Sequence, residues 1–314
     1  MIIFLKFNIF LSLFLFTFSS TAEVIHSLKG KVVRSLSLDY QSTNKILVGN
    51  KGAAVGSAFV YESRNFGKTW KVLNSGKPLS PQATDVQSVA YTPKLILAGT
   101  WKHGLFLSMD NGNSFKKSKT ISSSDIRDIK IVESSPLEVY LATSDSGLFK
   151  SIDGGLNWKK LKVPNEFFWS LNVLASGQVI TASSLDGRVY LSKDSGNTWN
   201  SIIEIESPFF AEVNPLNINE VVVVSEKKGV LRSTNKEEEW EELKFPGISK
   251  SFSSASYLSS GELILGTWDN GLINLNLATG VYKHSLAQIP VVHVKTKSNL
   301  LVIGTWGSGL FVVK

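Results

Sequence analysis

The sequence lacks cysteine entirely and has only two methionines and four histidines in 314 residues. The absence of cysteine excludes disulfide bonds and a lipid-modified N-terminal cysteine. Disulfides are common in small exported domains that cannot build a sufficient core. A chain of this length that is exported without them must depend on a large buried core instead.

Arginine is scarce as well. Only five of the 33 basic residues are arginines, and they are scattered along the chain: Arg34, Arg64, Arg127, Arg188 and Arg232. The formal net charge of +7 falls to +6 when Lys6 is removed with the leader described below. Proteins that read nucleic acids carry clustered basic patches rich in arginine. We therefore expect no nucleic-acid partner.

Long apolar runs are confined to the N-terminus. Lys6 is followed by an apolar stretch from Phe7 to Phe18 and then by small residues, including Ser20 and Ala22. This pattern predicts that residues 1–22 are a secretory signal peptide, cleaved before Glu23, and that the chain is periplasmic or extracellular. An uncleaved anchor helix is the alternative, but about a dozen apolar residues are fewer than the roughly 20 that a span needs. No membrane span is expected after cleavage.

An eight-residue pattern repeats through the rest of the chain. Its best copy is S-I-D-G-G-L-N-W, from Ser151 to Trp158, and further copies begin at Ser63, Ser108, Ser192 and Ser233. The successive serines lie 45, 43, 41 and 41 residues apart. Each copy is typical of a tight turn, with a carboxylate to accept backbone N–H groups and a glycine at positive φ. The period indicates a repeat protein.

The pattern S-x-D-x-G-x-x-W resembles the BNR or Asp-box repeat of β-propellers. The run Ala98-Gly99-Thr100 with Gly104-Leu105-Phe106 is similar to that of photosystem II stability/assembly-factor-like proteins of the WD40/YVTN/BNR-like group. The resemblance covers nearly the whole mature chain and implies a propeller. It implies little about function, because sialidases, other glycosidases, receptors and assembly factors share the repeat.

The length predicts seven blades, because the 292 residues from Glu23 to Lys314 divide into seven units of about 42. We expect one all-β domain, 23–314, of four-stranded antiparallel blades. The C-terminal part of the sequence supplies only three strands for blade seven, including its inner strand. Residues 23–27 should therefore add the fourth strand and leave no open sheet edge. Blade six has lost its box, and no helix is indicated. The predicted inner strands begin at Val33, Val86, Ile126, Phe168, Phe210, Phe252 and Val291.

The Asp boxes admit two interpretations. Asp110, Asp153 and Asp194 could be catalytic carboxylates or calcium ligands, but a turn-stabilising role is the simpler prediction. Asn65 and Asn235 replace the aspartate in two copies, which a turn tolerates better than a catalyst. The box aromatics are expected to fill the space between sheets: Trp70, Trp158, Trp199 and Trp240, with Phe115 in the remaining copy.

The inner strands predict a column of residues along the axial channel: Ser35, Ser88, Asp128, Ser170, Glu212, Ser254 and His293. Asp128, Glu212 and His293 are the members able to do acid–base chemistry or hold a metal. The alternative is a hydrated channel wall, and we predict neither a metal nor a cofactor. A sialidase is not expected, because the Arg-Ile-Pro segment of that family is absent. A glycosidase using Asp128 with Glu212, or Asp145 with Asp186, remains open.

The tripeptide Gly-Thr-Trp ends the second strand in three blades and places Trp101, Trp268 and Trp306 on one face, called the upper face here. We expect these indoles to form an arc, with His103 and Asp269 in the same loops, the inserted loop Lys51–Gly56 as a lid, and Trp169 opposite. Inter-blade packing is the alternative role. The resulting prediction is an exported, monomeric, non-enzymatic scaffold that binds a protein or peptide on this face; a glycosidase-like or carbohydrate-binding propeller is the alternative.

Overall fold

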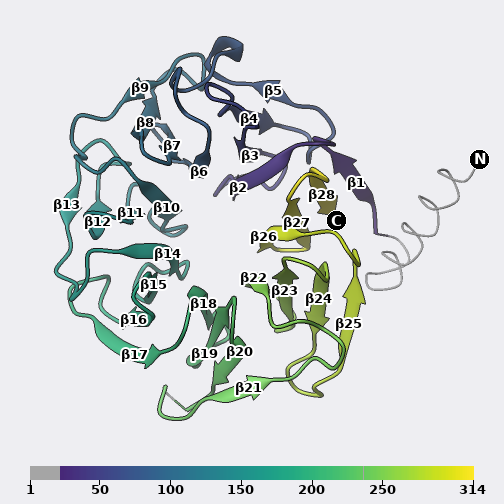
Figure 1. Cartoon of the computed structure of the whole chain (residues 1–314). Helices are drawn as coiled ribbons and strands as arrows, with labels where there is room; N and C mark the ends of the chain where they lie inside the picture. The colour runs from purple at the N-terminus through teal and green to yellow at the C-terminus, as the bar shows by residue number, and fades with distance from the viewer. Residues whose placement is uncertain (1–21, 236) are drawn as a thin grey trace, which may run out of the picture.

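The computed structural model describes residues 22–235 and 237–314, and the predicted signal peptide therefore lies outside the described residues except for Ala22. The chain forms seven antiparallel four-stranded sheets arranged as the blades of a ring (Figure 1). This confirms the predicted seven-bladed β-propeller. Blade one consists of β2 (Val32–Leu38), β3 (Ile46–Lys51), β4 (Val60–Ser63) and β5 (Lys71–Val72); blade two of β6 (Val86–Tyr91), β7 (Ile96–Thr100), β8 (Gly104–Ser108) and β9 (Lys116–Lys117); and blade three of β10 (Ile126–Ile131), β11 (Val139–Thr143), β12 (Leu148–Ser151) and β13 (Lys159–Lys160). Blade four consists of β14 (Phe168–Val173), β15 (Ile180–Ser184), β16 (Arg188–Ser192) and β17 (Asn200–Glu204), and blade five of β18 (Pro208–Asn214), β19 (Asn217–Ser225), β20 (Gly229–Ser233) and β21 (Glu241–Leu243). Blade six consists of β22 (Phe252–Tyr257), β23 (Leu263–Thr267), β24 (Leu272–Leu275) and β25 (Tyr282–Ser285), and blade seven of β26 (Val291–Lys297), β27 (Leu300–Thr305) and β28 (Leu310–Val313) with β1 (Val24–Ser27).

The N-terminal strand closes the ring as the sequence predicts. Strand β1 pairs antiparallel with β28, from Val24 opposite Val313 to Ser27 opposite Leu310. The backbones of Glu23 and Lys314 exchange two hydrogen bonds of 2.9 and 3.1 Å just beyond the ladder. Strand β1 therefore lies beside the C-terminal strand β28 in blade seven (Figure 1).

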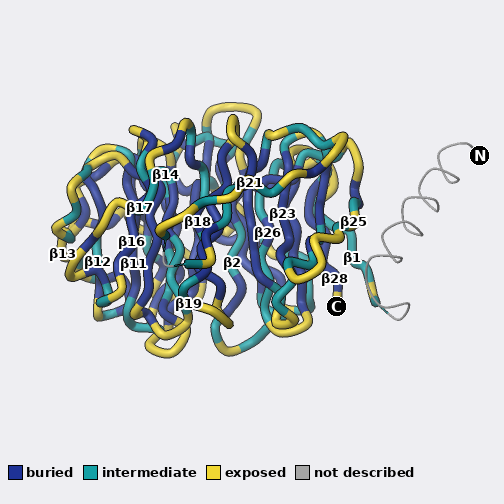
Figure 2. Tube along the Cα trace, turned by 90° about the horizontal axis from the view of Figure 1, so that it is seen from below, coloured by how far each residue is buried: buried dark blue, intermediate teal, exposed yellow. Residues whose placement is uncertain are grey.

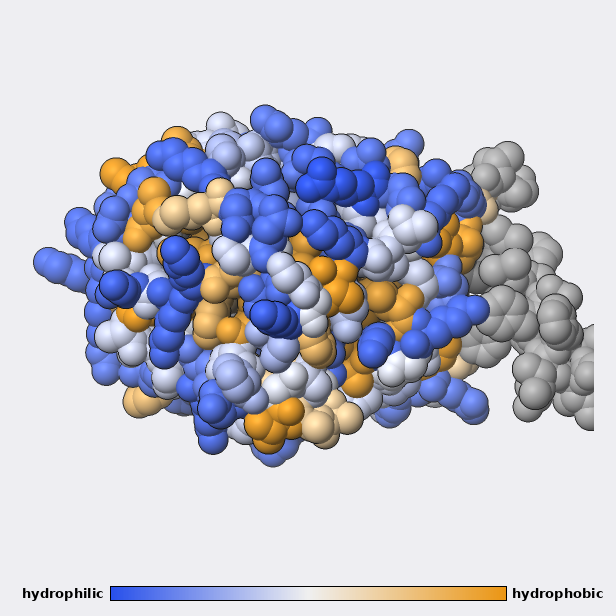
Figure 3. Space-filling model, turned by 90° about the horizontal axis from the view of Figure 1, so that it is seen from above, coloured by the Kyte–Doolittle hydropathy of each residue, from blue (hydrophilic) through white to orange (hydrophobic). Residues whose placement is uncertain are grey.

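The core lies between the sheets of neighbouring blades. The second strands are rich in Val, Ile and Leu because they are buried on both faces, which is why they read as continuous apolar runs. Between blades seven and one, for example, Val33 and Val48 pack with Val302 and Val312. Buried strands run between two layers of exposed loops in the side view (Figure 2). The outer rim seen in Figure 3 is mainly hydrophilic, with hydrophobic groups showing between charged side chains.

The structure corrects the predicted alignment of blade five. Each inner strand has a register shift near its start; in blade one it separates Val33 from Ser35. In blade five the shift separates Pro208 from Phe210, so Phe210 occupies the column position predicted for Glu212. Glu212 lies two residues deeper in the channel. The inner strand of blade five was misaligned because Phe209, Phe210 and Ala211 are successive apolar residues. Any of them could begin the apolar pattern of an inner strand, so the pattern alone does not fix the register of this strand.

Other features are minor for function. One 3-10 turn, Asn74–Gly76, connects β5 to β6, where no helical turn was expected. Within the described ranges 22–235 and 237–314, no helix is long and apolar enough to cross a membrane. Gly271 opens the third strand of blade six at φ +80°, and a side chain there would collide with the Leu286 carbonyl, so glycine is required on both counts.

Candidate functional site

The shifted residues of the inner strands form the upper mouth of the axial channel. A β-bulge leaves one residue unpaired and re-aims its side chain, and here every blade carries one. In blade order these are Arg34, Gln87, Arg127, Trp169, Phe209, Ser253 and Val292. The first six line a cavity of about 90 Å³, which we call the channel mouth. The mouth is polar over blades one to three, aromatic over blades four and five, and polar again at Ser253 of blade six.

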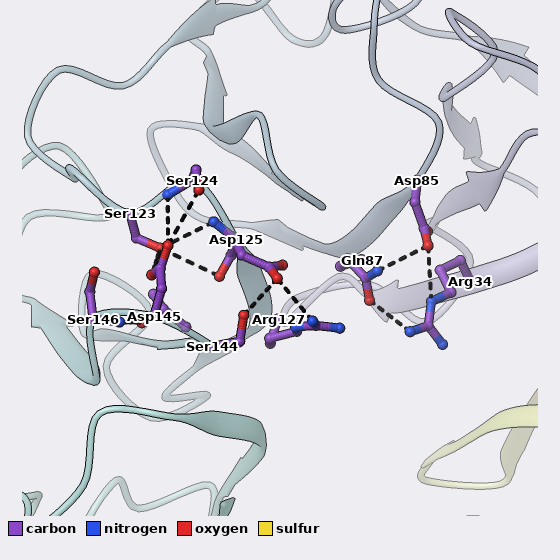
Figure 4. A network of polar contacts seen from close by, with 11 residues as sticks. Arg34, Asp85, Gln87, Ser123, Ser124, Asp125, Arg127, Ser144, Asp145 and Ser146 are labelled. Atoms are coloured by element: carbon purple, nitrogen blue, oxygen red, sulfur yellow. Dashed lines mark hydrogen bonds and ion pairs between the residues drawn. The ribbon is translucent and has the colours of Figure 1, made fainter. Parts of the chain in front are cut away.

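Two arginine–carboxylate clusters build the polar side. Arg34 lies 3.5 Å from Asp85 (Nε to Oδ2) and donates 2.8 Å to the Gln87 side chain. In blade three, two blades further along the ring, Arg127 donates a hydrogen bond to Asp125 at 2.9 Å. Burial lowers the pKa of Arg34, and burial likewise raises the pKa of Asp85. Figure 4 shows the two clusters, with Arg127 extending toward the side on which Arg34 and Gln87 lie.

Four rings in successive contact build the other side; we call them the aromatic row. Trp169 contacts Phe209 at 5.1 Å between ring centroids, Phe209 contacts Trp268 at 6.0 Å, and Trp268 contacts Trp306 at 6.1 Å. All three contacts are edge-to-face, a favoured geometry for aromatic pairs. The guanidinium of Arg127 stacks 4.6 Å from the Trp169 ring centroid, and so joins the row to the polar side.

The structure arranges the tryptophans of the upper face differently from the expected arc. Trp268 and Trp306 are neighbours as expected, but Trp169 joins them through Phe209 rather than standing opposite. Trp101 is 38% exposed and its ring faces the ammonium of Lys102 at 4.4 Å. Phe209 was missed, and its position immediately before the misaligned inner strand of blade five was the signal that could have found it. Trp306 is 39% exposed.

Hydrogen bonds hold the loops around the aromatic row in place. The backbone N–H groups of Gly52 and Gly56 donate to the carbonyls of Thr84 and Ala83, at 2.7 and 3.1 Å. The inserted loop 51–56 is therefore anchored at both ends, contrary to the expectation of a free lid. Asp269 accepts 2.7 Å from the Ser249 hydroxyl, and His103 lies half-buried between β7 and β8.

Asp128 stabilises the channel wall. Its carboxylate accepts from the hydroxyl of Ser88 in blade two, from the Leu171 N–H in blade four and from Lys130 at 2.8 Å. It also accepts from its neighbour Ile129. A carboxylate held by donors from three blades is poorly placed to exchange protons with a substrate.

His293 and Glu212 also line the channel mouth. Burial lowers the pKa of His293 to about 4, so its ring is neutral, and its Nε2 lies 2.5 Å from the Arg34 carbonyl. Burial raises the pKa of Glu212 to about 7, against the attraction of Lys295 and Lys130. Lys295 has its own pKa lowered by burial. In the described ranges no three His, Asp or Glu side chains are grouped so as to hold a metal ion.

The raised pKa of Glu212 predicts a pH-dependent stability. Because the pKa in the folded state exceeds the ordinary glutamate pKa of 4.5, this group stabilises the fold fully below pH 4.5, and the contribution is lost as pH rises through about 7. The variant Glu212→Gln cannot ionise. Its stability relative to the parent should therefore rise between about pH 5 and pH 8, by on the order of 2 kcal/mol. Urea midpoints across that range measure this difference, and parallel curves for the two proteins would contradict it.

The octapeptide turns lie on the face opposite the mouth. In the copy starting at Ser151, the serine hydroxyl donates 2.7 Å to Asp153 and accepts 2.9 Å from the Gly155 N–H. Asp153 also accepts from the Asn157 N–H at 3.0 Å, and Trp158 Nε1 donates to the Gly155 carbonyl at 3.1 Å. Hydrogen bonds from turn residues lower the pKa of each box aspartate to about 2: Asp110, Asp153 and Asp194. These carboxylates are saturated by their own turns.

The lower end of the channel is bridged by one side chain. Lys297 Nζ donates to the carbonyls of Asp39 and Tyr40 at 3.1 and 3.0 Å, and pairs with Glu133 at 3.2 Å. Lys297 belongs to blade seven, whereas its partners belong to blades one and three. The bridge joins three blades across the lower part of the channel, where the space between the inner strands measures about 240 Å³.

Comparisons with known proteins identify the fold. No protein-family profile matches the sequence, and no curated protein matches it. Among solved structures, YCF48 bound to a D1 peptide has a TM-score of 0.71 at 16% identity, over 93% of this chain and 96% of that one. YCF48 from Cyanidioschyzon merolae has a TM-score of 0.69 at 10% identity, over 93% and 98%. The WD40 propeller domain of Doa1 has a TM-score of 0.67 at 13% identity, over 92% and 94%. The chain is a seven-bladed β-propeller similar in fold to these proteins.

Proposed function

We propose that this chain is a non-enzymatic scaffold that holds a segment of a partner protein across the upper face of the propeller. The observation that carries the proposal is the channel mouth itself. Trp169 and Phe209, the first two rings of the aromatic row, line a small cavity whose other side presents Arg34, Gln87 and Arg127. The row continues from this cavity through Trp268 to Trp306. Aromatic rings beside directed polar groups are typical of a recognition site.

The chemistry of the channel supports binding rather than catalysis. Asp128 is occupied by four donors, and the box aspartates are occupied by their own turns. Tryptophan and arginine, by contrast, are enriched at binding hot spots. Aromatic side chains bury large apolar areas there, and the tryptophan N–H can also donate a hydrogen bond. A similar fold that holds a peptide, in the YCF48 structure with D1 peptide, supports the same reading.

The proposal includes membership of the BNR/Asp-box propellers and export. The repeated octapeptide supports the first, through its shared serine–aspartate–glycine hydrogen bonds. The leader-like residues 1–22 support the second. A partner in the periplasm or outside the cell follows from it. N-terminal sequencing of protein from the exporting cell should find Glu23 first, and a retained Met1 would contradict export.

Removing an indole of the aromatic row should weaken partner binding. We expect Trp268→Ala or Trp306→Ala to cost about 2 kcal/mol or more in binding, the hot-spot range. Stability should fall by less than the about 3–5 kcal/mol typical of truncating a fully buried tryptophan, because Trp306 is 39% exposed and Trp268 is only partly buried. The partner is first captured from the native envelope with the mature domain, and its affinity is then measured by calorimetry.

The matched control is Trp158→Ala, on the opposite face, which should lower stability but leave affinity unchanged. Trp101→Ala reports whether the site extends into blade two. Full binding by both row variants together with a collapse in stability would show that the indoles serve packing. A glycan array run beside the capture tests the carbohydrate-binding alternative. A glycan that binds the parent but not Trp268→Ala would favour a carbohydrate ligand over a protein partner.

A further inference from the structure

A second cavity lies on the upper face, between the loops of blades seven and one. Its volume is about 530 Å³, within the size range of ligand pockets. Its walls are the connection to β2 (Gly30–Val32), the start of the inserted loop (Asn50–Ala54) with Ser57, and the rings of Phe59 and Trp306. Backbone bridges from Val32 to Trp306 and from Lys51 to Asp85 hold these walls together.

This cavity is continuous with the aromatic row. Trp306 is the last ring of the row and also a wall of the cavity. Phe209, near the other end, lines the channel mouth, and Trp268 contacts both rings. An apolar path therefore leads from the mouth over blades five and six into the second cavity. A partner segment lying along the row would reach both cavities at once.

The charge of the second cavity differs from that of the channel. Among its described lining residues two are lysines, Lys31 and Lys51, and none is an acid. Both lysines are exposed, and Lys51 Nζ lies 4.8 Å from the Trp306 ring centroid. The acid next to this cavity, Asp85, is already shared by Arg34 and Gln87. The channel, in contrast, sets Asp128 and Glu212 against Lys130 and Lys295.

We infer that the partner segment is amphipathic along its length, with apolar side chains over the aromatic row and an acidic stretch in the second cavity beside Lys31 and Lys51. This inference rests on the proposed peptide-binding function and adds the chemistry and direction of the bound segment. The acidic end lies at blade one and the apolar end points toward blade four. Two cations facing an apolar cavity with no acid in its lining favour a carboxylate-bearing side chain over a neutral one.

Two synthetic probe peptides test the inference with the mature domain. One carries three leucines followed by three glutamates, and the other carries glutamines in place of the glutamates. Fluorescence anisotropy should show the acidic probe binding about fivefold or more tightly at low salt, with the advantage shrinking as ionic strength rises. Equal affinities, or no binding of the acidic probe up to about 1 mM, would overturn the inference.

The double variant Lys31→Gln with Lys51→Gln should reduce the difference between the probes to less than about twofold. Its matched control, Lys116→Gln with Lys117→Gln on exposed strand β9, removes the same charge elsewhere and should keep the difference. Loss of the difference in both double variants would indicate a general charge effect and overturn the inference. If both probes bind equally and both depend on Trp268, the proposed function stands and only the acidic assignment fails. If neither depends on Trp268 or Trp306, the proposed function fails.

Discussion

Deleting residues 23–30 should destabilise the whole propeller, because this segment carries the strand that closes it. The deletion removes the ladder between β1 and β28, the paired backbone bonds between Glu23 and Lys314, and the partly buried Val24, Ile25 and Leu28. It also takes away Ser27, which accepts the Trp70 indole N–H at 3.0 Å. The edge of β28 would face solvent, and blades seven and one would lose their covalent connection and part of their packing.

The expected loss is on the order of 4 kcal/mol or more, from apolar area and ladder hydrogen bonds together. That corresponds to a fall in Tm of about 10 °C for a domain of this size. Calorimetry of the deletion variant beside a chain that begins at Glu23 measures the effect. A variant that melts within about a degree or two of its parent would show that the closure carries little stability.

Two single proline substitutions test the closure by strand β1 without removing the strand. The 23–314 pair exchanges hydrogen bonds, so the alternation of an antiparallel ladder directs the Ile25 N–H toward Val312 and the Val24 N–H outward. Ile25→Pro removes a ladder bond, whereas Val24→Pro removes an N–H that faces away from β28. The first should lower Tm clearly more than the second. Equal effects would mean that the ladder register is not what holds the strand.

The blade count was predictable because it depends on spacing. Tight turns with a serine, an aspartate and a glycine recur at an almost constant interval, and each interval must contain one four-stranded sheet. The missing outer strand of blade seven followed from the same count. Neither conclusion required knowledge of where any side chain points.

The channel mouth was not predictable in this way. Arg34 and Arg127 are far apart in the sequence and read as scattered, yet both occupy the bulge of an inner strand, two blades apart. A bulge shifts one residue out of the alternation, so period-two reasoning assigns its direction wrongly. Phe209 was overlooked for the same reason, and with it the ring that joins Trp169 to Trp268.

Buried carboxylates show a second limit of sequence reasoning. Glu220 begins the buried part of β19 and is 5% exposed, a position where an acid suggests function. Its oxygens instead accept from Tyr257 of the next blade and from Arg232 of the next strand, both at 3.0 Å. Glu62 accepts likewise from Tyr91 of the next blade, and also from Arg64, two residues further along its own segment. The two tyrosine–glutamate contacts join neighbouring blades, and sequence spacing does not reveal them.

Arg232→Ala should be among the most destabilising single substitutions in the chain. The Arg232 side chain is 18% exposed and the Glu220 side chain 6%, and they form an ion pair at 3.0 Å. Without the guanidinium, Glu220 keeps only the Tyr257 hydroxyl as a side-chain partner among the contacts in the described ranges. Breaking a buried pair from one side costs about 3–5 kcal/mol, because the remaining charge is buried without compensation.

The chain supplies a matched control in the neighbouring blade. Arg188 also lies at the third strand and pairs with Asp186 and Glu204, but these side chains are 38–68% exposed. Arg188→Ala should therefore cost no more than about 1 kcal/mol. The double variant Arg232→Met with Glu220→Met removes both charges and should recover most of the loss. Guanidinium unfolding of the three variants decides the point. If Arg232→Ala is as mild as Arg188→Ala, or if the double variant is worse than the single one, the Glu220 carboxylate is not the source of the penalty.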